Sequence, residues 1–478
     1  MNWVLRLVSL LWIVLLLSFS VVTVGLNDSF LGLPLVCSLD TCISAMEGSQ
    51  SDFANYLRLA DLLVSGEIGV DSVNAWLLVT WPPGMGVTYS AIHLLTWGTS
   101  AFSLTYLVLV VAVWSLLLWL PVLLARSLRT ALVSLTLGTF VALSPPFQDW
   151  LLGAGIFYSE SLSIAFFVAS QVLYLAAFSS YVSDCARLWI ALISGGAMGV
   201  AAYYRSVFDL VGLTVSAIFL VFIGAILLLK FGHFVKPNQA VPLKLMSRPS
   251  KRLLQACLLW VVAFTIVTQP WRVAVNRLIA QGATTFAPGG QRAWVNGWLP
   301  SERLPDWAVD VGMNGFCTAY PEDCRRIENL ENSTAAPYSG SGALTPGEFR
   351  DSAMQSISAD PQPWIDDRVN LAVRQSLAAL GGNSLSFVLL FASLAMMAAS
   401  CLLIVRNFAT AHSLERLSMA IFLCVAWIVP VLPLFMSSME PRYFFPSLIS
   451  SWVIFSYVIV FSRRAGSTQN PSFRSVEA

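Results

Sequence analysis

Ten long apolar runs constrain what this chain can fold into more than any other feature of the sequence. Each run reaches the roughly 18 to 20 residues that an α-helix needs to cross a lipid bilayer. The expected spans are residues 3–25, 102–124, 130–147, 158–181, 187–204, 207–230, 253–270, 383–405, 417–436 and 443–461. A spanning segment has to satisfy its backbone polar groups within itself, which favours helices. The sequence therefore predicts an all-α fold, a polytopic transmembrane helix bundle.

The charged residues are few. Charged side chains make up 11% of the 478 residues and hydrophobic ones 57%, whereas a soluble domain has roughly 25% charged residues. These values exclude a soluble globular chain. The formal net charge of +1 gives no indication of a nucleic-acid partner, and none is expected.

The distribution of the basic residues predicts which side of the membrane each loop faces. Alternate loops, together with Arg6 and the C-terminal tail, hold 15 of the 27 Lys and Arg residues but only 3 of the 26 acids. Loop 230–252 alone carries six basic residues and no acid. Cytoplasmic loops are enriched in Lys and Arg, so both termini are expected in the cytoplasm. The opposite, extracytoplasmic side is the predicted outer face.

The first apolar run lies where a secretory signal peptide would lie. Its apolar stretch is long for a signal peptide, and the sequence VVTVG at 21–25 lacks an A-x-A cleavage pattern. An uncleaved membrane anchor is therefore expected. The chain has 4 Lys against 23 Arg, a ratio typical of GC-rich bacterial genomes, so the expected location is a bacterial plasma (inner) membrane.

The spans divide the chain into four units. An N-terminal transmembrane module covers 1–270 and contains a long outer loop, 26–101. The outer segment 271–382 is rich in Gly, Pro, Ser and Asp and is large enough for a small subdomain. Transmembrane helices at 383–462 and a cytoplasmic tail at 463–478 complete the chain.

The first outer loop holds two pieces with helical character. The stretch SDFANYLRLADLLVSG at 51–66 has its apolar residues at helical spacing. These residues are Phe53, Tyr56, Leu57, Ala60, Leu63 and Val64. The stretch WPPGMGVTYSAIHLL at 81–95 is apolar but too short to span. A helix is expected to begin near Pro83, because proline fits the first turn of a helix but not its interior.

Four cysteines form two close pairs on the predicted outer face. Cys37 lies near Cys42, and Cys317 lies near Cys324. The outer side of a membrane is an oxidising environment, which favours disulfides. Metal binding is the alternative, but these spacings without a nearby histidine are poor zinc sites. Both pairs are expected to be disulfides.

Ionisable residues beside spans are costly and point to function. Those expected on the outer face are Asp52, Asp149, Glu160, Arg205 with Asp209, and Arg442. A carboxylate can take the proton of a hydroxyl group. Arginines can hold a phosphate by bidentate hydrogen bonds and stabilise charge that develops on it. The set predicts a reaction between a nucleophile and an anionic lipid.

The acidic residues also have structural interpretations. Asp52 lies where a helix N-cap would lie, and aspartate is a favoured cap. Asp149 could be a loop residue near the headgroups, and Glu160 an interfacial carboxylate at the mouth of a span.

The basic residues have structural interpretations as well. Arg205 and Asp209 are spaced i, i+4 and could form a plain helix pair. Arg442 could extend to the interface while its stem lies in apolar surroundings. His93 ends an apolar run, where packing is the simplest role.

Five short motifs follow one another along the chain. They are SDFANYLRLADLLVSG with WPPGMG, LARSLRTALVSLTLGTFVALSPPF, GIFYSESLSI, QPWRVAVNRLIAQG and EPRYFFPSLIS. This order resembles the GT-C superfamily, the polyprenyl-phosphate-sugar-dependent glycosyltransferases. In the first motif that family has an Asp, a Tyr four residues later, an Ala, a Gly and a later Pro-Pro pair. The outer segment 271–382 matches nothing beyond its first residues.

The resemblance implies a GT-C-like fold with juxtamembrane helices in the first outer loop. It also implies an inverting glycosyltransferase that uses a sugar carried on a polyprenyl phosphate at the outer face. Asp52 matches the catalytic carboxylate of the family. Glu160 and Asp149 both match the second acidic site of the family.

The resemblance further implies the substrate contacts and partners. Arg205 and Arg442 would contact the donor phosphate, and Tyr56 and His93 would lie in the substrate site. The acceptor would be a cell-envelope glycan, a lipid or a protein, in contact with membrane lipids. No cofactor is certain. The Asp-x-Asp and Glu-Glu pairs that some members of the family have are absent here, as is the WWDYG signature of oligosaccharyltransferases. The alternative to a reaction without a cofactor is one that uses a divalent cation held by Asp52 and Glu160.

Two other classes of function remain alternatives at the level of sequence. A transporter or lipid flippase predicts charges buried at mid-membrane, broken helices and internal repeats, and no repeat relates the two halves of this chain. A polymerase or ligase of surface polysaccharides with another fold would also use outer arginines and lipid-linked donors, but would not need the early Asp-Tyr-Ala-Gly pattern.

Overall fold

The structure is a computed structural model, and most of the residues that it describes lie in helices. The described residues are 3–27, 30, 33–46, 52–67, 82–179, 182–235, 248–279, 322, 354–407, 413–432 and 441–462. Within them, extended pairing is confined to an isolated bridge between Phe30 and Leu33. The all-α fold expected from the apolar runs is confirmed.

The first half of the chain contains the following helices, with η1 a short π-helix. They are α1 (Trp3–Asn27), α2 (Leu39–Ala45), α3 (Asp52–Ser65), α5 (Gly84–Leu95), α6 (Ala101–Leu124), α7 (Leu128–Ala142), η1 (Pro146–Leu151), α8 (Ser159–Ala177), α9 (Asp184–Tyr204) and α10 (Ser206–Val235).

The second half adds further long helices and one 3-10 helix, η6. They are α11 (Arg248–Ile279), α17 (Gln362–Ala379), α18 (Ser384–Asn407), α19 (Ser413–Ile428), η6 (Pro441–Phe444) and α20 (Phe445–Ser462).

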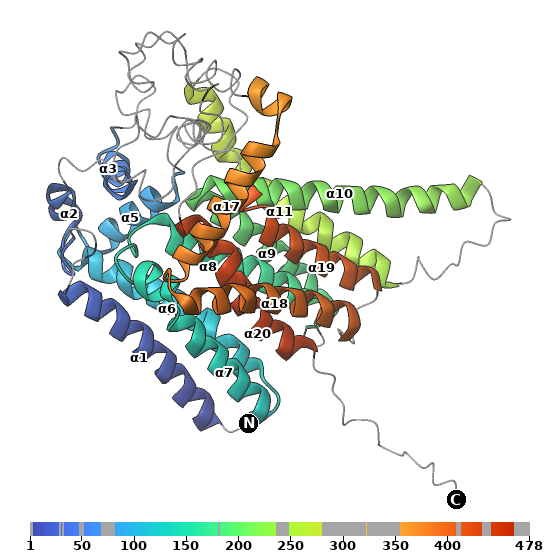
Figure 1. The fold of residues 1–478 in the computed structure, drawn as a ribbon, viewed down its shortest axis with the longest axis horizontal. Coiled ribbons are helices and arrows are strands. Elements are labelled where there is room, and N and C mark those ends of the chain that lie inside the picture. Colours follow the sequence, from blue (N-terminus) through green and yellow to red (C-terminus); the bar gives the residue numbers. More distant parts are fainter. Residues whose placement is uncertain are drawn as a thin grey trace, which may run out of the picture.

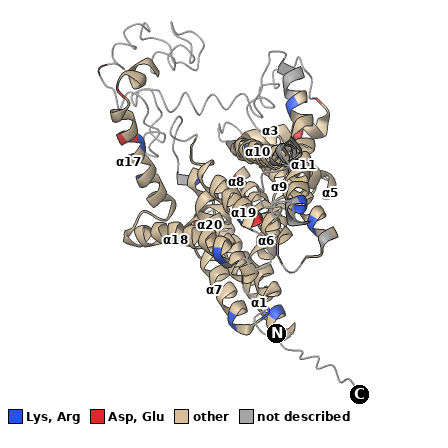
Figure 2. Cartoon of the chain, turned by 90° about the vertical axis from the view of Figure 1, so that its right-hand side faces the viewer, with Lys and Arg blue, Asp and Glu red and all other residues tan. Residues whose placement is uncertain are grey.

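Eight of the described helices are long and apolar enough to cross a membrane: α1, α6, α8, α9, α10, α11, α18 and α20. Figure 2 shows how few charged residues these helices carry. The chain is therefore an integral membrane protein, as expected.

Two of the ten predicted spans are shorter than expected. The run 130–147 is interrupted, because α7 ends at Ala142 and Pro146 starts the π-helix η1. The run 417–436 corresponds to α19, which has 16 residues and ends at Ile428. Both predicted spans extend past the helix ends because the apolar composition of the sequence continues beyond them.

Two helices form the interior of the bundle. Among the spanning helices, α20 and α8 bury the largest shares of their residues inside the bundle. Helix α1 buries a much smaller share. The helices α1, α6 and α7 pack side by side at one edge, while α18 and α19 flank α20 (Figure 1). The central helices α8 and α20 therefore provide the most rigid positions for side chains near their ends.

The segment between α1 and α6, predicted to be an outer loop, contains short helices that pack beside the spans. Helix α5 begins at Gly84, directly after Pro83, as the sequence predicted, and its 12 residues are too few to span. The predicted apolar face of α3 is buried at Phe53, Tyr56, Leu57 and Ala60, whereas Leu63 and Val64 at its end are exposed. Helix α3 packs mainly on α5.

The predicted disulfide between Cys37 and Cys42 is present, with the two Cα atoms 5.7 Å apart. Both cysteines are buried at the start of the first outer loop. The second predicted disulfide, between Cys317 and Cys324, lies outside the described residues. The predicted tail 463–478 and most of the segment 271–382 also lie outside them.

A close approach between α9 and α11 requires glycine. A Cβ atom added to Gly195 would lie 2.2 Å from the backbone oxygen of Trp260, whereas one added to the neighbouring Gly196 would meet no atom within 4 Å. Backbone atoms cannot move aside without shifting a helix. Of these two positions, therefore, 195 is the one that has to be glycine.

We expect Gly195→Ala to lower the free energy of unfolding by about 1–3 kcal/mol, the usual range for overpacking. Gly196→Ala is the matched control and should leave stability unchanged or raise it by up to about 1 kcal/mol, because alanine favours helix. Thermal or denaturant unfolding in detergent measures both. Equal effects of the two substitutions would contradict the close approach.

Candidate functional site

The backbone that leads into α8 is held by two buried tyrosines. The Tyr89 hydroxyl of α5 donates to the carbonyl oxygen of Phe157 at 2.5 Å, and the Tyr106 hydroxyl of α6 donates to that of Ile156 at 2.9 Å. These carbonyl groups precede the helix and have no partner within it. The two hydroxyl groups therefore satisfy backbone acceptors in the segment directly before α8.

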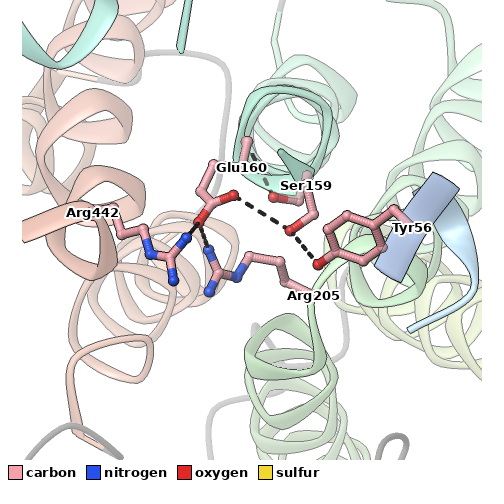
Figure 3. Close-up of polar contacts among 6 residues, drawn as sticks. Tyr56, Ser159, Glu160, Arg205 and Arg442 are labelled. Carbon is pink, nitrogen blue, oxygen red and sulfur yellow. Dashed lines mark hydrogen bonds and ion pairs between the residues drawn. The ribbon is translucent and has the colours of Figure 1, made fainter. Parts of the chain in front are cut away.

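Glu160 lies in that first turn and is 1% exposed. One of its carboxylate oxygens, Oε1, accepts a hydrogen bond from Arg205 and lies 3.5 Å from Nη1 of Arg442 (Figure 3). The other, Oε2, accepts from the Ser159 hydroxyl at 3.4 Å. The positive end of the helix dipole also favours a carboxylate at this position. Glu160 is therefore a buried carboxylate held between two guanidinium groups.

The two arginines come from distant parts of the chain that meet at one end of the bundle. Arg205 follows α9 in an extended conformation, with φ −146° and ψ 126°, so it stands at the junction of α9 and α10. Arg442 lies in η6, directly before α20. Because α8 and α20 both begin here and α9 ends here, the fold collects these charges at one membrane boundary.

Aromatic rings surround the two arginines. The Arg442 guanidinium carbon lies 5.5 Å from the ring centroids of both Tyr158 and Tyr443 and 5.8 Å from that of Trp150. The Arg205 guanidinium carbon lies 5.1 Å from the Tyr443 ring. Cation–π contacts of this kind hold a guanidinium group without using its N–H donors.

The exposure of the three charged side chains increases from the acid to the arginines. The side chain of Glu160 is 2% exposed, that of Arg442 is 14% and that of Arg205 is 20%. Among the side chains that the structure describes, two guanidinium groups share one carboxylate, which gives these three groups one positive charge in excess. An approaching ligand would meet arginines before the carboxylate, and the net charge favours an anion.

Four of the residues predicted to form the site lie together: Tyr56, Glu160, Arg205 and Arg442 (Figure 3). The alternative of a plain Arg205–Asp209 helix pair is wrong. Asp209 instead pairs with Arg272 of α11, because Arg205 lies outside α10 and pairs with Glu160.

Asp52 is the first residue of α3, and its side chain lies outside the described part of the structure. The next residue, Phe53, packs against Phe157 and Tyr158, with ring centroids 5.6 and 6.1 Å apart. The backbone at the head of α3 therefore lies beside the start of α8. The role of Asp52 as a base stays a prediction.

Asp149 and His93 are placed differently from the cluster. Asp149 is an exposed residue of η1, next to Trp150, and the protein around its carboxyl group raises its pKa above the usual range by partial desolvation. His93 lies in the last turn of α5, where its ring packs beside Gly98 in the following turn. Their predicted substrate roles stay predictions.

Side chains that could share a metal ion do not gather in the described part of the chain. No group of three or more His, Cys, Asp or Glu residues there has the required closeness. The predicted cation alternative involves Asp52, whose side chain is not described, so it stays a prediction.

Several contacts of the cluster were missed by the sequence analysis. Ser159 connects Tyr56 to Glu160, and Tyr443 and Trp150 lie beside the arginines. Each of the three is the sequence neighbour of a predicted residue, which is the one signal that could have found them. A serine or an aromatic residue beside a span is too common to be selected on that signal alone.

No family model matches the chain, and no curated protein matches it. Among solved structures, the chain is similar to the archaeal oligosaccharyltransferase AglB from Archaeoglobus fulgidus, in complex with an inhibitory peptide and a dolichol-phosphate. The TM-score is 0.45 and the identity 13%, over 94% of this chain and 50% of that chain. This chain thus spans about half the length of its structural neighbour. A likeness this low does not assign the chain to a family.

A double-mutant cycle tests the pairing of Glu160 with Arg205. Each single substitution, Glu160→Gln or Arg205→Gln, should lower the free energy of unfolding by about 3 kcal/mol, because it leaves an opposite charge poorly compensated. The double variant should lose at least about 1 kcal/mol less than the sum.

Unfolding in detergent provides the measurement. Glu67→Gln, at an exposed position just after the end of α3, is the control and should change stability by less than about 0.5 kcal/mol. Additive effects of the two cluster substitutions would show that the pair contributes no coupling energy.

Proposed function

We propose that this protein is a membrane glycosyltransferase that moves a sugar from a polyprenyl-phosphate donor to an acceptor hydroxyl at the extracytoplasmic face. The observation that carries the proposal is the pair of arginines around one buried carboxylate. The excess positive charge suits the phosphate of a lipid-linked donor. The order of the sequence motifs, which resembles the GT-C superfamily, supports the same conclusion.

The position of the cluster also suits a lipid-linked substrate. Arg205 and Arg442 lie at the boundary of the membrane-spanning helices, next to the starts of α10 and α20. A polyprenyl chain in the bilayer would place its phosphate at this level. A transporter would instead need its charges near mid-membrane, and these charges lie at helix ends.

The reaction can be written with these residues in defined roles. The Asp52 carboxylate takes the proton of the acceptor hydroxyl while the hydroxyl oxygen attacks the anomeric carbon of the sugar. The bond between that carbon and the phosphate oxygen breaks, and the lipid phosphate leaves with the bonding electrons. Arg205 and Arg442 stabilise the negative charge on the departing phosphate. This single displacement inverts the anomeric centre.

In this proposal Glu160 is a positioning residue. It holds both guanidinium groups in place before the donor arrives, so their orientation costs little at the moment of reaction. Because Glu160 is more buried than either arginine, it anchors them without occupying the ligand side of the cluster.

Transfer from synthetic polyprenyl-phosphate sugars to a panel of acceptors tests the base. Asp52→Asn should lower kcat by at least about 100-fold, the usual loss of a general base. Asp61→Asn, on the exposed side of the same helix, is the control and should keep most of the activity. Activity of Asp52→Asn within a few-fold of the unchanged protein would reduce Asp52 to a helix cap.

A conservative substitution tests the phosphate contacts. Arg442→Lys keeps the charge but loses the planar fork that binds a phosphate by two hydrogen bonds. We expect the donor KM to rise by about tenfold or more, because one charge-assisted hydrogen bond contributes about that factor. Arg58→Lys, on an exposed position of α3, is the matched control. An unchanged donor KM in Arg442→Lys would place the donor phosphate elsewhere.

A further inference from the structure

A chain of hydrogen bonds connects α3 to the two arginines. The Tyr56 hydroxyl donates to the Ser159 hydroxyl oxygen at 3.1 Å, and Ser159 donates to Oε2 of Glu160 at 3.4 Å (Figure 3). The other oxygen of Glu160 accepts from Arg205. Tyr56 and Ser159 are 103 residues apart in sequence, and both are buried. The connection therefore depends on the tertiary fold.

Neighbouring tyrosines show that this arrangement is more than a way to satisfy a buried hydroxyl. Tyr89 and Tyr106 donate to backbone carbonyl oxygens just before α8. Tyr56 instead donates to a side chain that itself contacts the buried acid. A tyrosine hydroxyl that donates to a backbone carbonyl group is the end of a chain of side-chain hydrogen bonds. Ser159 accepts from Tyr56 and donates to Glu160, so the chain of hydrogen bonds continues through it.

Helix α3 packs closely on α5, where a Cβ atom added to Gly86 would lie 2.6 Å from the Leu59 side chain and where Ser90 donates to the Ala60 carbonyl oxygen. Toward the start of α8, the described contacts of α3 include the Tyr56 hydroxyl group and the Phe53 ring. The Tyr56 hydrogen bond is the described contact that connects α3 to the arginine cluster through side chains.

We propose that Ser159 and Tyr56 are positioning residues that couple α3 to the occupancy of the Arg205–Arg442 cluster. The inference rests on the proposed function, since the occupant is the phosphate of the lipid-linked donor. It assigns to α3 a position that depends on whether that donor is bound. Asp52, the first residue of α3, is carried by the same helix.

The coupling follows from the competition for guanidinium N–H donors. A bound phosphate draws the Arg205 guanidinium group toward itself and so weakens its hydrogen bond to Oε1 of Glu160. The buried carboxylate then relies more on its other partners, among them the Ser159 hydroxyl group, because a poorly compensated charge in this environment is costly. A stronger acceptor polarises the Ser159 hydroxyl, which in turn binds Tyr56 more tightly. Helix α3 is held most firmly when the donor is present.

This arrangement has a consequence for the order of events. The head of α3 is held most firmly in its position once the donor phosphate has bound, so activation of the acceptor hydroxyl is favoured next to a sugar that can receive it. A base fixed in place without the donor would give no such order.

Hydrogen exchange of the backbone amides of α3 tests the coupling without relying on activity. Farnesyl monophosphate serves as the probe, added to the purified full chain in detergent. In the unchanged protein we expect the probe to slow exchange in α3 by at least about threefold. Tyr56→Phe and Ser159→Ala should abolish this slowing while the probe still binds with a Kd within about threefold, since both variants keep the two arginines and their pairing with Glu160.

Tyr106→Phe is the matched control. It also removes one buried tyrosine hydroxyl beside the start of α8, but that hydroxyl donates to a backbone carbonyl. We expect the slowing in α3 to persist in this variant. A loss of the effect in Tyr106→Phe as well would show that any disturbance near α8 suffices, and would overturn the coupling.

Steady-state kinetics provide a second readout. Tyr56→Phe should lower kcat by about tenfold with the donor KM nearly unchanged, whereas loss of a donor contact would raise that KM. Probe binding with equal slowing in Tyr56→Phe and the unchanged protein would overturn the coupling alone. Failure of the unchanged protein to bind the probe would overturn both the coupling and the phosphate site of the proposed function.

Discussion

The ion pairing of Glu160 with Arg205 and Arg442 is the interaction on which one end of the bundle depends. A carboxylate buried at a membrane boundary is tolerated only if opposite charges accompany it. Glu160 begins α8, Arg205 joins α9 to α10 and Arg442 precedes α20. None of these segments can move away from the other two without leaving a charge uncompensated. The same requirement holds the cluster together before any substrate arrives.

The scaffold around the cluster explains why it sits where it does. Helices α8 and α20 are the most buried of the spanning helices, so close packing restrains the segments from which Glu160 and Arg442 project. Tyr89 and Tyr106 also donate hydrogen bonds to the backbone that leads into α8. By contrast, α3 lies in the segment between the spans α1 and α6 and packs mainly on α5. A rigid phosphate site beside a less constrained helix suits a reaction in which one substrate is held and the other is positioned afterwards.

The surplus of positive charge links the stability of the cluster to its proposed chemistry. Among the described side chains, one carboxylate faces two guanidinium groups, and a phosphodiester in a lipid-linked sugar would add the negative charge that balances them. The aromatic rings of Tyr158 and Tyr443 support the arginines through their faces and leave N–H groups for hydrogen bonding. Affinity for an anion and the internal ion pair thus come from the same side chains, and this is why occupancy can be communicated through Glu160.

The sequence by itself determined the all-α membrane fold, the start of α5 after Pro83 and the residue types at the boundary, because apolar length and proline geometry act locally. The end of α7 was misjudged, since an apolar run shows no break where its helix gives way to η1. Only the tertiary structure decided the pairing of the charges. The i, i+4 spacing of Arg205 and Asp209 suggests a pair, but the extended backbone at Arg205 places it outside α10, and each residue pairs with a helix distant in sequence. Spacing predicts contacts only within a continuous helix. Where helices end, the packing of the whole bundle selects the partners.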